Sequence, residues 1–264
     1  MWKSLRLIMR YLKYLTKAKS KYHIHSPFVF ELITRVIENE FAYPEYLKAE
    51  ATRQEMLNNH SSIEVVDFGA KSGNKSYTSS FKKISEIAKN SAIAPKYGQL
   101  LYRLVKHFEP QFILEIGTSL GISTIYQALA SPQSKLFCIE GCANTAEKAQ
   151  ENFNKLRLNN IELNIGNFDL LLPVILKKIK TIDFAFIDGN HRKEPTINYF
   201  EQCLPLTTNN SVLIFDDIHW SEGMEEAWNH IIANSKVTLS IDLFFMGIIF
   251  FKKELCKQDF IIRH

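Results

Sequence analysis

The chain has few cysteines and no long apolar run, and each absence excludes a class of protein. Its four cysteines include no C-x-x-C pair, which argues against a disulfide framework and favours reduced thiols in a cytoplasmic protein. No apolar stretch is long enough to cross a bilayer. The amino terminus lacks both an uninterrupted apolar core and a small-residue cleavage site, so no secretory signal is expected.

Acidic residues are absent from residues 1–21, which carry seven Lys or Arg. The rest of the chain has 25 basic and 28 acidic residues, so the net charge of +4 comes from this segment. A helix is predicted over residues 1–20, because apolar residues recur at spacings of three and four: Trp2, Leu5, Ile8, Met9, Leu12 and Leu15. Such a helix suits an anionic lipid surface or a nucleic acid. It equally suits docking on its own domain or on a second copy in a homodimer.

The remaining composition is that of an ordinary globular protein. Hydrophobic residues make up 46% of the 264 positions and charged residues 23%, enough for a sizeable core. An α/β domain of this length can fold undivided.

The most informative stretch is Gln111–Ala130, QFILEIGTSLGISTIYQALA. An apolar run leads into a loop with Gly117 and Gly121 and then into an amphipathic helical pattern. Strand, glycine loop and helix form the unit that binds nucleotide-like cofactors at the carboxyl edge of a parallel sheet. A second apolar run, Lys135–Glu140, ends on an acid that can accept hydrogen bonds from both hydroxyls of a ribose.

The glycine spacing separates two cofactor classes. The dinucleotide pattern G-x-G-x-x-G would require glycine at Ser119 and Ile122, and neither is glycine. The stretch Tyr97–Leu129, with its "GQ" and "LEIG" segments, instead resembles the class I O-methyltransferases of the catechol and caffeoyl-CoA type. The resemblance continues through Asp188 and Asp216-Asp217 and covers about residues 95–252. It implies S-adenosylmethionine as cofactor.

The order of predicted elements agrees with that family. Five strand–helix units are followed by two strands, Val237–Phe244 and Gly247–Lys252, which are too close for a crossover and must form a hairpin. We therefore expect an α/β fold: a Rossmann-like, seven-stranded methyltransferase sheet over residues 95–264, preceded by a mainly helical extension over residues 1–94. Ser62–Gly73 also reads as strand, acid and glycine, but no second buried strand ending in an acid follows it. We interpret residues 61–75 as an accessory strand or loop that can line the pocket.

The resemblance assigns cofactor roles to individual residues. It places Gly117 and Ser119 under the methionine part, with Gly121 completing the loop, and Ser123 at the carboxylate, although Ser123 could equally be a plain N-cap. Glu140 would hold the ribose, and Glu115 would order the loop. The turn after the third strand, with Asn167 and Phe168, would contact the adenine.

Acidic residues follow the fourth and fifth predicted strands. Ends of neighbouring parallel strands lie about 5 Å apart, so Asp188, Asp216 and Asp217 can converge. The resemblance places a divalent metal there, and oxygen ligands suit Mg²⁺ or Ca²⁺. Asp188-Gly189 is also a turn dipeptide, and either later acid could cap a helix. We also expect Asp188 to take part in cofactor binding and in catalysis. His191 is a candidate general base, and His219 and Trp220 are candidates for the wall of the acceptor pocket.

Two absent motifs narrow the acceptor. Enzymes that methylate nucleobase amino groups usually have a Pro-Pro motif, and the chain has none. Cytosine-C5 methyltransferases require a Pro-Cys loop, which the chain also lacks. A small hydroxylated molecule is the first expectation. Methylation of an RNA or lipid-linked acceptor delivered by the basic helix, and a non-catalytic cofactor-binding scaffold, remain alternatives.

Overall fold

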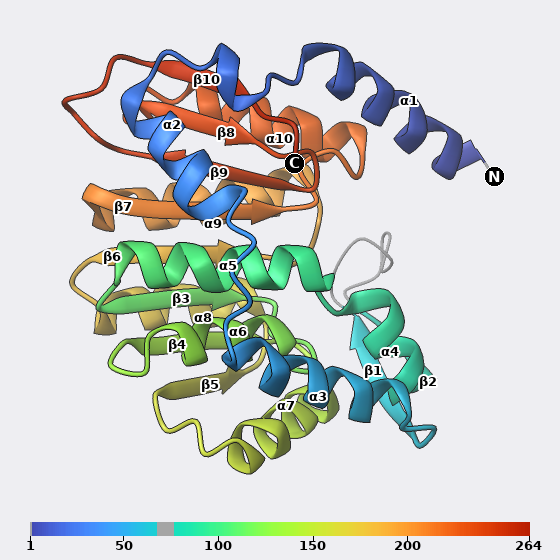
Figure 1. The fold of residues 1–264 in the computed structure, drawn as a ribbon. Coiled ribbons are helices and arrows are strands. Elements are labelled where there is room, and N and C mark those ends of the chain that lie inside the picture. Colours follow the sequence, from blue (N-terminus) through green and yellow to red (C-terminus); the bar gives the residue numbers. More distant parts are fainter. Residues whose placement is uncertain (1, 68–76) are drawn as a thin grey trace. The chain divides into compact units, whose positions relative to one another are not determined.

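The computed structural model describes residues 2–67 and 77–264 (Figure 1). They form two compact units: the residues up to Asn39 together with Thr181–His264, and Glu40–Lys180. No helix within the described ranges is both long and apolar enough to cross a membrane. The predicted division into an extension over 1–94 and a domain over 95–264 stays a prediction.

The unit Glu40–Lys180 is built on three parallel strands: β3 (Phe112–Ile116), β4 (Lys135–Glu140) and β5 (Ile161–Ile165). Ile116 pairs with Ile139, and Glu140 pairs with Ile165. The carboxyl ends of all three strands therefore lie at one edge. The helices that precede and follow these strands in the chain are α5 (Pro95–Phe108), α6 (Ile122–Ala130), α7 (Ala143–Lys155) and α8 (Phe168–Lys178).

Helix α5 packs directly on α6 because Gly98 lacks a side chain. A Cβ at this position would lie 2.4 Å from the ring of Tyr126, which is fully buried. Only glycine allows so close an approach without displacing the ring. This contact gives the glycine of the "GQ" segment a structural role.

The segment before α5 contains two elements that were not predicted. Helix α3 (Glu45–Leu57) is one, and strand β2 (Thr78–Lys83) is the other. The accessory strand expected within residues 61–75 is β1 (Ser62–Asp67), which pairs with β2 in antiparallel fashion. Residues 68–76 lie outside the described ranges, so their part in lining a pocket stays a prediction. Helix α4 (Ile84–Ser91) then leads to α5.

The other unit contains a mixed sheet in the order β10-β8-β9-β7-β6. Strands β6 (Ile182–Ile187) and β7 (Thr207–Asp216) are parallel, and α9 (Lys193–Cys203) connects them. After α10 (Glu222–Ala233), strands β8 (Leu239–Asp242) and β9 (Met246–Phe250) form the predicted antiparallel hairpin. The short strand β10 (Gln258–Ile261) pairs in parallel with β8 and was not predicted.

The amino-terminal helix α1 (Trp2–Lys17) docks on this same unit. Tyr14 is buried, and its hydroxyl donates a hydrogen bond to the carbonyl of Ile262. The Lys19 N–H donates to the carbonyl of Ile261 over 2.8 Å. Docking on its own domain, one of the alternatives for the basic helix, is therefore confirmed. After a short turn, α2 (Pro27–Leu32) begins at an N-cap, Ser26, and continues as a π-helical turn, Ile33–Ile37.

The predicted α/β class is confirmed. Three parallel strands in one unit and two in the other, each followed by a helix, form in the predicted order together with the terminal hairpin. Strands with both faces covered are almost entirely apolar, which made β3, β4, β6 and β7 recognisable.

Candidate functional site

The loop between β3 and α6 has an unusual backbone. Gly117, Ser119 and Gly121 all have positive φ angles, of 99°, 49° and 84°. The Gly117 N–H donates to the carbonyl of Ile139 at 2.9 Å, which ties the loop to β4. At Gly121 a Cβ would lie 2.5 Å from the ring of Phe153, so this glycine is required by both its φ angle and its surroundings.

Glu140, at the end of β4, is fixed beside this loop. One carboxylate oxygen accepts a hydrogen bond from the Ser119 N–H at 2.6 Å. The other accepts from the Cys142 N–H at 2.9 Å and from the Thr145 hydroxyl at 3.1 Å. Burial raises the pKa of Glu140, and these donors partly oppose the rise. The side chain is thus held in one orientation, with its residue still partly exposed.

Glu115 lies inside the unit, with no exposed surface. Its carboxylate accepts hydrogen bonds from the Thr124 hydroxyl and, at 2.8 Å, from the Gln127 amide, both on α6. Burial raises its pKa, and hydrogen bonds from Thr124 and Ser123 counteract part of that effect. Glu115 therefore anchors the start of α6, in agreement with the ordering role predicted for it.

Ser123 is not the N-cap of α6, so this alternative to the carboxylate-binding role is wrong. Helix α6 begins at Ile122, and its N-cap is Gly121, which has no side chain to offer. Ser123 is buried within the first turn, and its hydroxyl interacts with Glu115. The glycine's left-handed backbone, which a sequence pattern does not reveal directly, sets the true start of the helix.

The turn after β5 is attached to the same edge. The Gly166 N–H donates to the carbonyl of Glu140 at 2.9 Å. Asn167 is the N-cap of α8, where its side-chain oxygen accepts from the Asp169 N–H at 2.8 Å. Phe168 is the first helical residue and is partly exposed.

The structure thus separates the predicted cofactor residues of this unit into two groups. Five are partly exposed around the strand ends: Gly117, Ser119, Glu140, Asn167 and Phe168. Three are buried and stabilise the loop and the start of α6: Glu115, Gly121 and Ser123. A fixed carboxylate beside glycine-loop N–H groups fits an adenosine cofactor, whose ribose offers two hydroxyl donors. Thr145 and the Cys142 N–H, which orient Glu140, were missed because no motif marks them.

The other unit carries the predicted acidic cluster. Ile187 of β6 pairs with Phe215 of β7, so Asp188 and Asp216 follow at adjacent strand ends. Their side chains share a hydrogen bond. Burial, followed by the negative charge of Asp217, raises the pKa of Asp216 well above its usual value. The predicted convergence of these acids is confirmed.

His191 lies between two of the acids. Its Nε2 is 3.4 Å from an oxygen of Asp188, and its Nδ1 is 3.9 Å from an oxygen of Asp217. Asp217 has a left-handed backbone, with φ of 55°, and its N–H donates to the carbonyl of Phe245 at 2.6 Å. Burial raises the pKa of Asp217, and His191 partly counteracts this. The imidazole side chain keeps 29% of its surface exposed.

These acids do not form a ready metal site. Within the described ranges, no group of three or more His, Cys, Asp or Glu side chains is arranged to hold a metal ion. The predicted metal set of Asp188, Asp216 and Asp217 has suitable donor chemistry, but its arrangement does not fit, and bound Mg²⁺ or Ca²⁺ stays a prediction.

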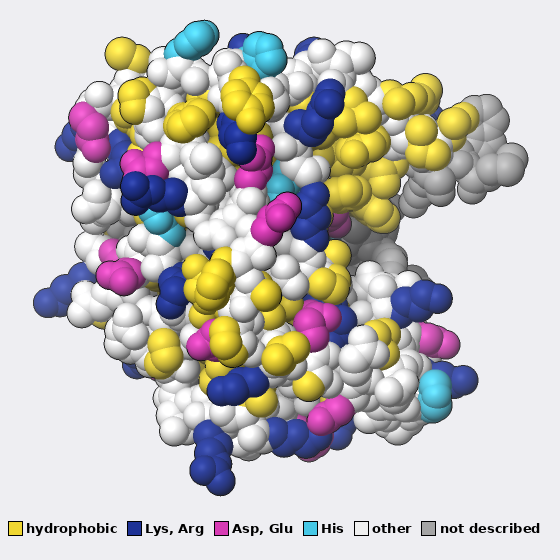
Figure 2. Space-filling model, viewed as in Figure 1, with side chains coloured by type: hydrophobic (Ala, Val, Ile, Leu, Met, Phe, Trp, Pro, Cys, Tyr) yellow, Lys and Arg dark blue, Asp and Glu magenta, His cyan; other side chains and the backbone are white. Residues whose placement is uncertain are grey.

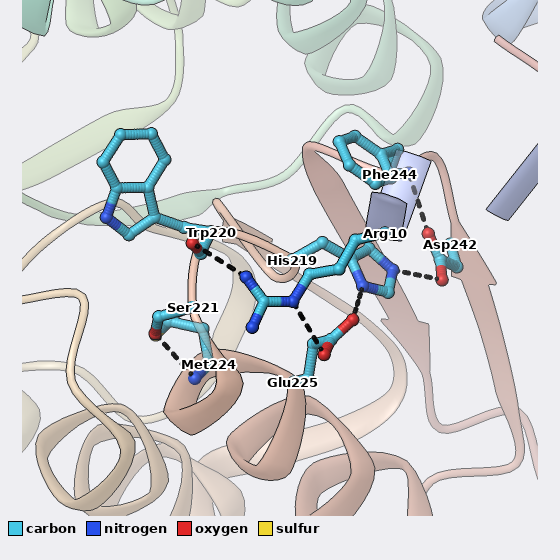
Figure 3. Close-up of polar contacts among 8 residues, drawn as sticks. All are labelled: Arg10, His219, Trp220, Ser221, Met224, Glu225, Asp242 and Phe244. Carbon is cyan, nitrogen blue, oxygen red and sulfur yellow. Dashed lines mark hydrogen bonds and ion pairs between the residues drawn. The ribbon is translucent and has the colours of Figure 1, made fainter. Parts of the chain in front are cut away.

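His219 lies in a network of its own (Figure 3). Its Nδ1 and Nε2 are each 2.8 Å from a carboxylate, of Glu225 and Asp242 respectively. The ring stacks on Phe244 with centroids 5.0 Å apart. Burial alone lowers the pKa of His219, but the two carboxylates outweigh it and raise the pKa above its usual value. Both ring nitrogens are thus engaged within the protein, whereas Trp220, also suggested for the pocket wall, is 53% exposed.

Comparisons with known proteins agree with this fold. A family model described as a methyltransferase domain matches residues 114–218. The chain is 28% identical to a catechol O-methyltransferase of Niastella koreensis, over 48% of this chain and 58% of that protein. It therefore spans little more than half the length of this curated relative.

Solved structures share the fold over most of the chain. An SAH-bound methyltransferase of Podospora anserina has a TM-score of 0.60 at 14% identity, covering 87% of this chain and 97% of its own. The O-methyltransferase TomG of Streptomyces achromogenes, solved with SAM, has a TM-score of 0.55 at 20% identity, covering 84% and 94%. Likeness at such low identity concerns the fold alone. Residues 114–218 thus match a methyltransferase domain, and the chain is similar in sequence to catechol O-methyltransferases and in fold to solved O-methyltransferases.

Proposed function

We propose that this protein transfers the methyl group of S-adenosylmethionine to a hydroxyl group of a small acceptor. The observation that supports this most directly is the position of Glu140, whose carboxylate is fixed beside the glycine loop by the Ser119 N–H at 2.6 Å. A preoriented carboxylate at the end of the second strand accepts hydrogen bonds from ribose hydroxyls without a cost of reordering.

The other exposed residues of this edge complete the cofactor assignment. Gly117 and Ser119 are assigned to the methionine part, where the absence of a side chain at Gly117 lets backbone approach the ligand. Asn167 and Phe168 are assigned to the adenine, and the partly exposed ring of Phe168 offers it a stacking face.

The acceptor chemistry is assigned to His191 and Asp188. S-adenosylmethionine, when bound, supplies a methyl group on a positively charged sulfur. A hydroxyl attacks such a carbon faster when its proton is taken up as the new bond forms, and a neutral imidazole is a suitable base near pH 7. The carboxylate of Asp188, 3.4 Å from His191, orients the ring and stabilises it after it has accepted the proton.

The proposed proton transfer uses His191 and Asp188 and does not require a metal ion. Whether a metal ion takes part is tested separately, by titrating Mg²⁺ in the presence of S-adenosylmethionine. We expect no gain in cofactor affinity. A gain that is lost in Asp217→Ala would instead favour the predicted metal set.

Calorimetric titration of S-adenosylmethionine tests the cofactor assignment. Wild-type protein should bind with micromolar affinity, and Glu140→Ala should bind at least about tenfold more weakly, because hydrogen bonds to a charged group are lost. Glu147→Ala, which removes an exposed acid of the adjacent α7, serves as the matched control and should bind normally. Absence of binding to the wild type would overturn the proposal.

Turnover with a panel of catechols and other hydroxylated molecules tests the acceptor class. Intact cofactor binding with no turnover on any of them would favour a non-catalytic cofactor-binding scaffold. Turnover only on RNA or on a lipid-linked molecule would favour the alternative in which the basic helix delivers such an acceptor.

We also propose that the protein is located in the cytoplasm. This location is supported by four free cysteines, three of them buried. Association as a homodimer stays a prediction.

A further inference from the structure

Helix α1 has three distinct faces. The first is docked: Tyr14 is buried, and its ring and that of Tyr11 contact Phe244 at centroid distances of 5.3 and 4.9 Å. Arg10 adds an ion pair to Glu225 at 3.1 Å. These contacts lie within one compact unit, so α1 is a fixed part of that unit.

The second face is apolar and uncovered. Leu5, Ile8, Met9 and Leu12 follow the i, i+3, i+4, i+7 pattern that places side chains on one side of a helix. Each is between 52% and 56% exposed. In Figure 2 hydrophobic side chains gather over α1. Four large apolar side chains in one stripe form a surface of the kind that marks a binding site.

The third face is basic. Arg6, Lys13 and Lys17 are exposed and lie on α1 between the apolar stripe and the docked face. The segment 1–21 has seven Lys or Arg and no acid of its own; Arg10 pairs with Glu225 and Lys21 with Glu38, which leaves Arg6, Lys13 and Lys17 exposed beside the stripe. An apolar stripe bordered by these positive charges is complementary to a surface that has an apolar interior and an anionic outer layer.

These features favour one occupant over the other candidates. A second copy of the chain, packed through the same stripe, would bring two rows of like charge together, which is unfavourable. A bilayer containing anionic lipids offers acyl chains to the leucines and negative headgroups to the lysines and arginines. With 16 residues, α1 is about 24 Å long, too short to span a hydrocarbon core of about 30 Å.

We propose that α1 binds anionic membrane surfaces, lying in the plane of the interface with Leu5, Ile8, Met9 and Leu12 toward the acyl chains. The docked face holds the rest of its unit close to the lipid headgroups while the helix is bound. This peripheral contact is independent of methyl transfer, and its test requires neither cofactor nor acceptor.

Flotation of the full-length protein with lipid vesicles tests the proposal. We expect binding to vesicles of phosphatidylcholine with phosphatidylglycerol, little binding to phosphatidylcholine alone, and weakening as salt rises. The double variant Leu5→Gln/Leu12→Gln should lower the partition coefficient at least about tenfold. Arg6→Gln/Lys13→Gln should lower it by roughly tenfold or more on anionic vesicles.

Matched controls lie in the other unit. Leu47→Gln removes an apolar side chain that is 75% exposed, and Lys48→Gln/Lys89→Gln removes two exposed charges. These variants should bind like the wild type, and circular dichroism should show that every variant is folded. Absence of binding to anionic vesicles, or equal binding by the α1 variants, would overturn the proposal. So would a concentration-dependent dimer in sedimentation that Leu5→Gln/Leu12→Gln abolishes, because the apolar stripe would then be covered by a second copy.

Discussion

The guanidinium of Arg10 in α1 and the carboxylate of Glu225 in α10 are 3.1 Å apart, although 215 positions separate them in the chain. The other oxygen of Glu225 is 2.8 Å from His219, which in turn contacts Asp242 (Figure 3). One chain of charges therefore connects the amino-terminal helix to the segment that follows β7. Docking of α1 and the order of that segment are linked through Glu225.

Replacing Arg10 by Met should loosen α1 while retaining most of the apolar stem. The pair is partly exposed, so the unfolding free energy should fall by only about 0.5–1 kcal/mol. Cleavage by trypsin within residues 11–21 should become clearly faster, because the docked helix opens more often. Lys148→Met, which breaks the Lys148–Glu151 pair of α7, is the control and should not alter that cleavage. Unchanged cleavage in the Arg10 variant would show that Tyr14 and its neighbours hold α1 without the ion pair.

Gly121→Ala should destabilise the protein by about 1–3 kcal/mol and weaken S-adenosylmethionine binding. The cause is a φ of 84° combined with a Cβ position 2.5 Å from Phe153, which forces the loop or the ring to shift. Gly223→Ala is the matched control, since its Cβ would have ordinary contacts and its place in the first turn of α10 favours alanine slightly. Thermal unfolding and calorimetric titration measure the two effects. Equal stability of the two variants would contradict the argument that the φ angle and the surroundings of Gly121 require glycine.

Glu115→Gln should change how stability depends on pH. Burial raises the pKa of Glu115 above the ordinary value of 4.5, so the folded state keeps a proton that the unfolded state releases. In the wild type this group therefore destabilises the fold progressively as pH rises above about 4.5, up to its folded pKa. Glutamine has no proton to lose, so the variant should gain relative to the wild type over that range. Urea unfolding at a series of pH values measures the difference, and a difference constant with pH would refute the argument.

His191→Gln should reduce kcat by roughly a hundredfold or more while S-adenosylmethionine binding stays normal, because the proposed base is removed and the cofactor residues are not. His230→Gln, at an exposed position of α10 that contacts Glu201, is the control and should retain kcat. Steady-state kinetics with a hydroxylated acceptor identified in the turnover panel provide the measurement. Normal kcat in the His191 variant would remove it from the mechanism.

Much of the fold was predictable because it rests on local patterns. The apolar runs Phe112–Ile116 and Lys135–Glu140 are strands buried on both faces, and their spacing leaves room only for helical crossovers. Strand β2 (TSSFKK) escaped prediction because it is polar, and strand β10 because it has only four residues. β2 forms only through pairing with β1, and β10 only through pairing with β8.

By itself the sequence determined the α/β class, the order of elements and the identity of the glycine loop with its acids, since these depend on periodicity and residue type within a few turns of chain. Only the tertiary structure decided which residues are exposed around the strand ends, such as Glu140, and which are buried beneath them, such as Glu115. It also decided that Tyr14 docks α1 on its own unit while Leu12 remains uncovered. These outcomes depend on contacts between positions far apart in the chain, and local patterns carry no information about such contacts.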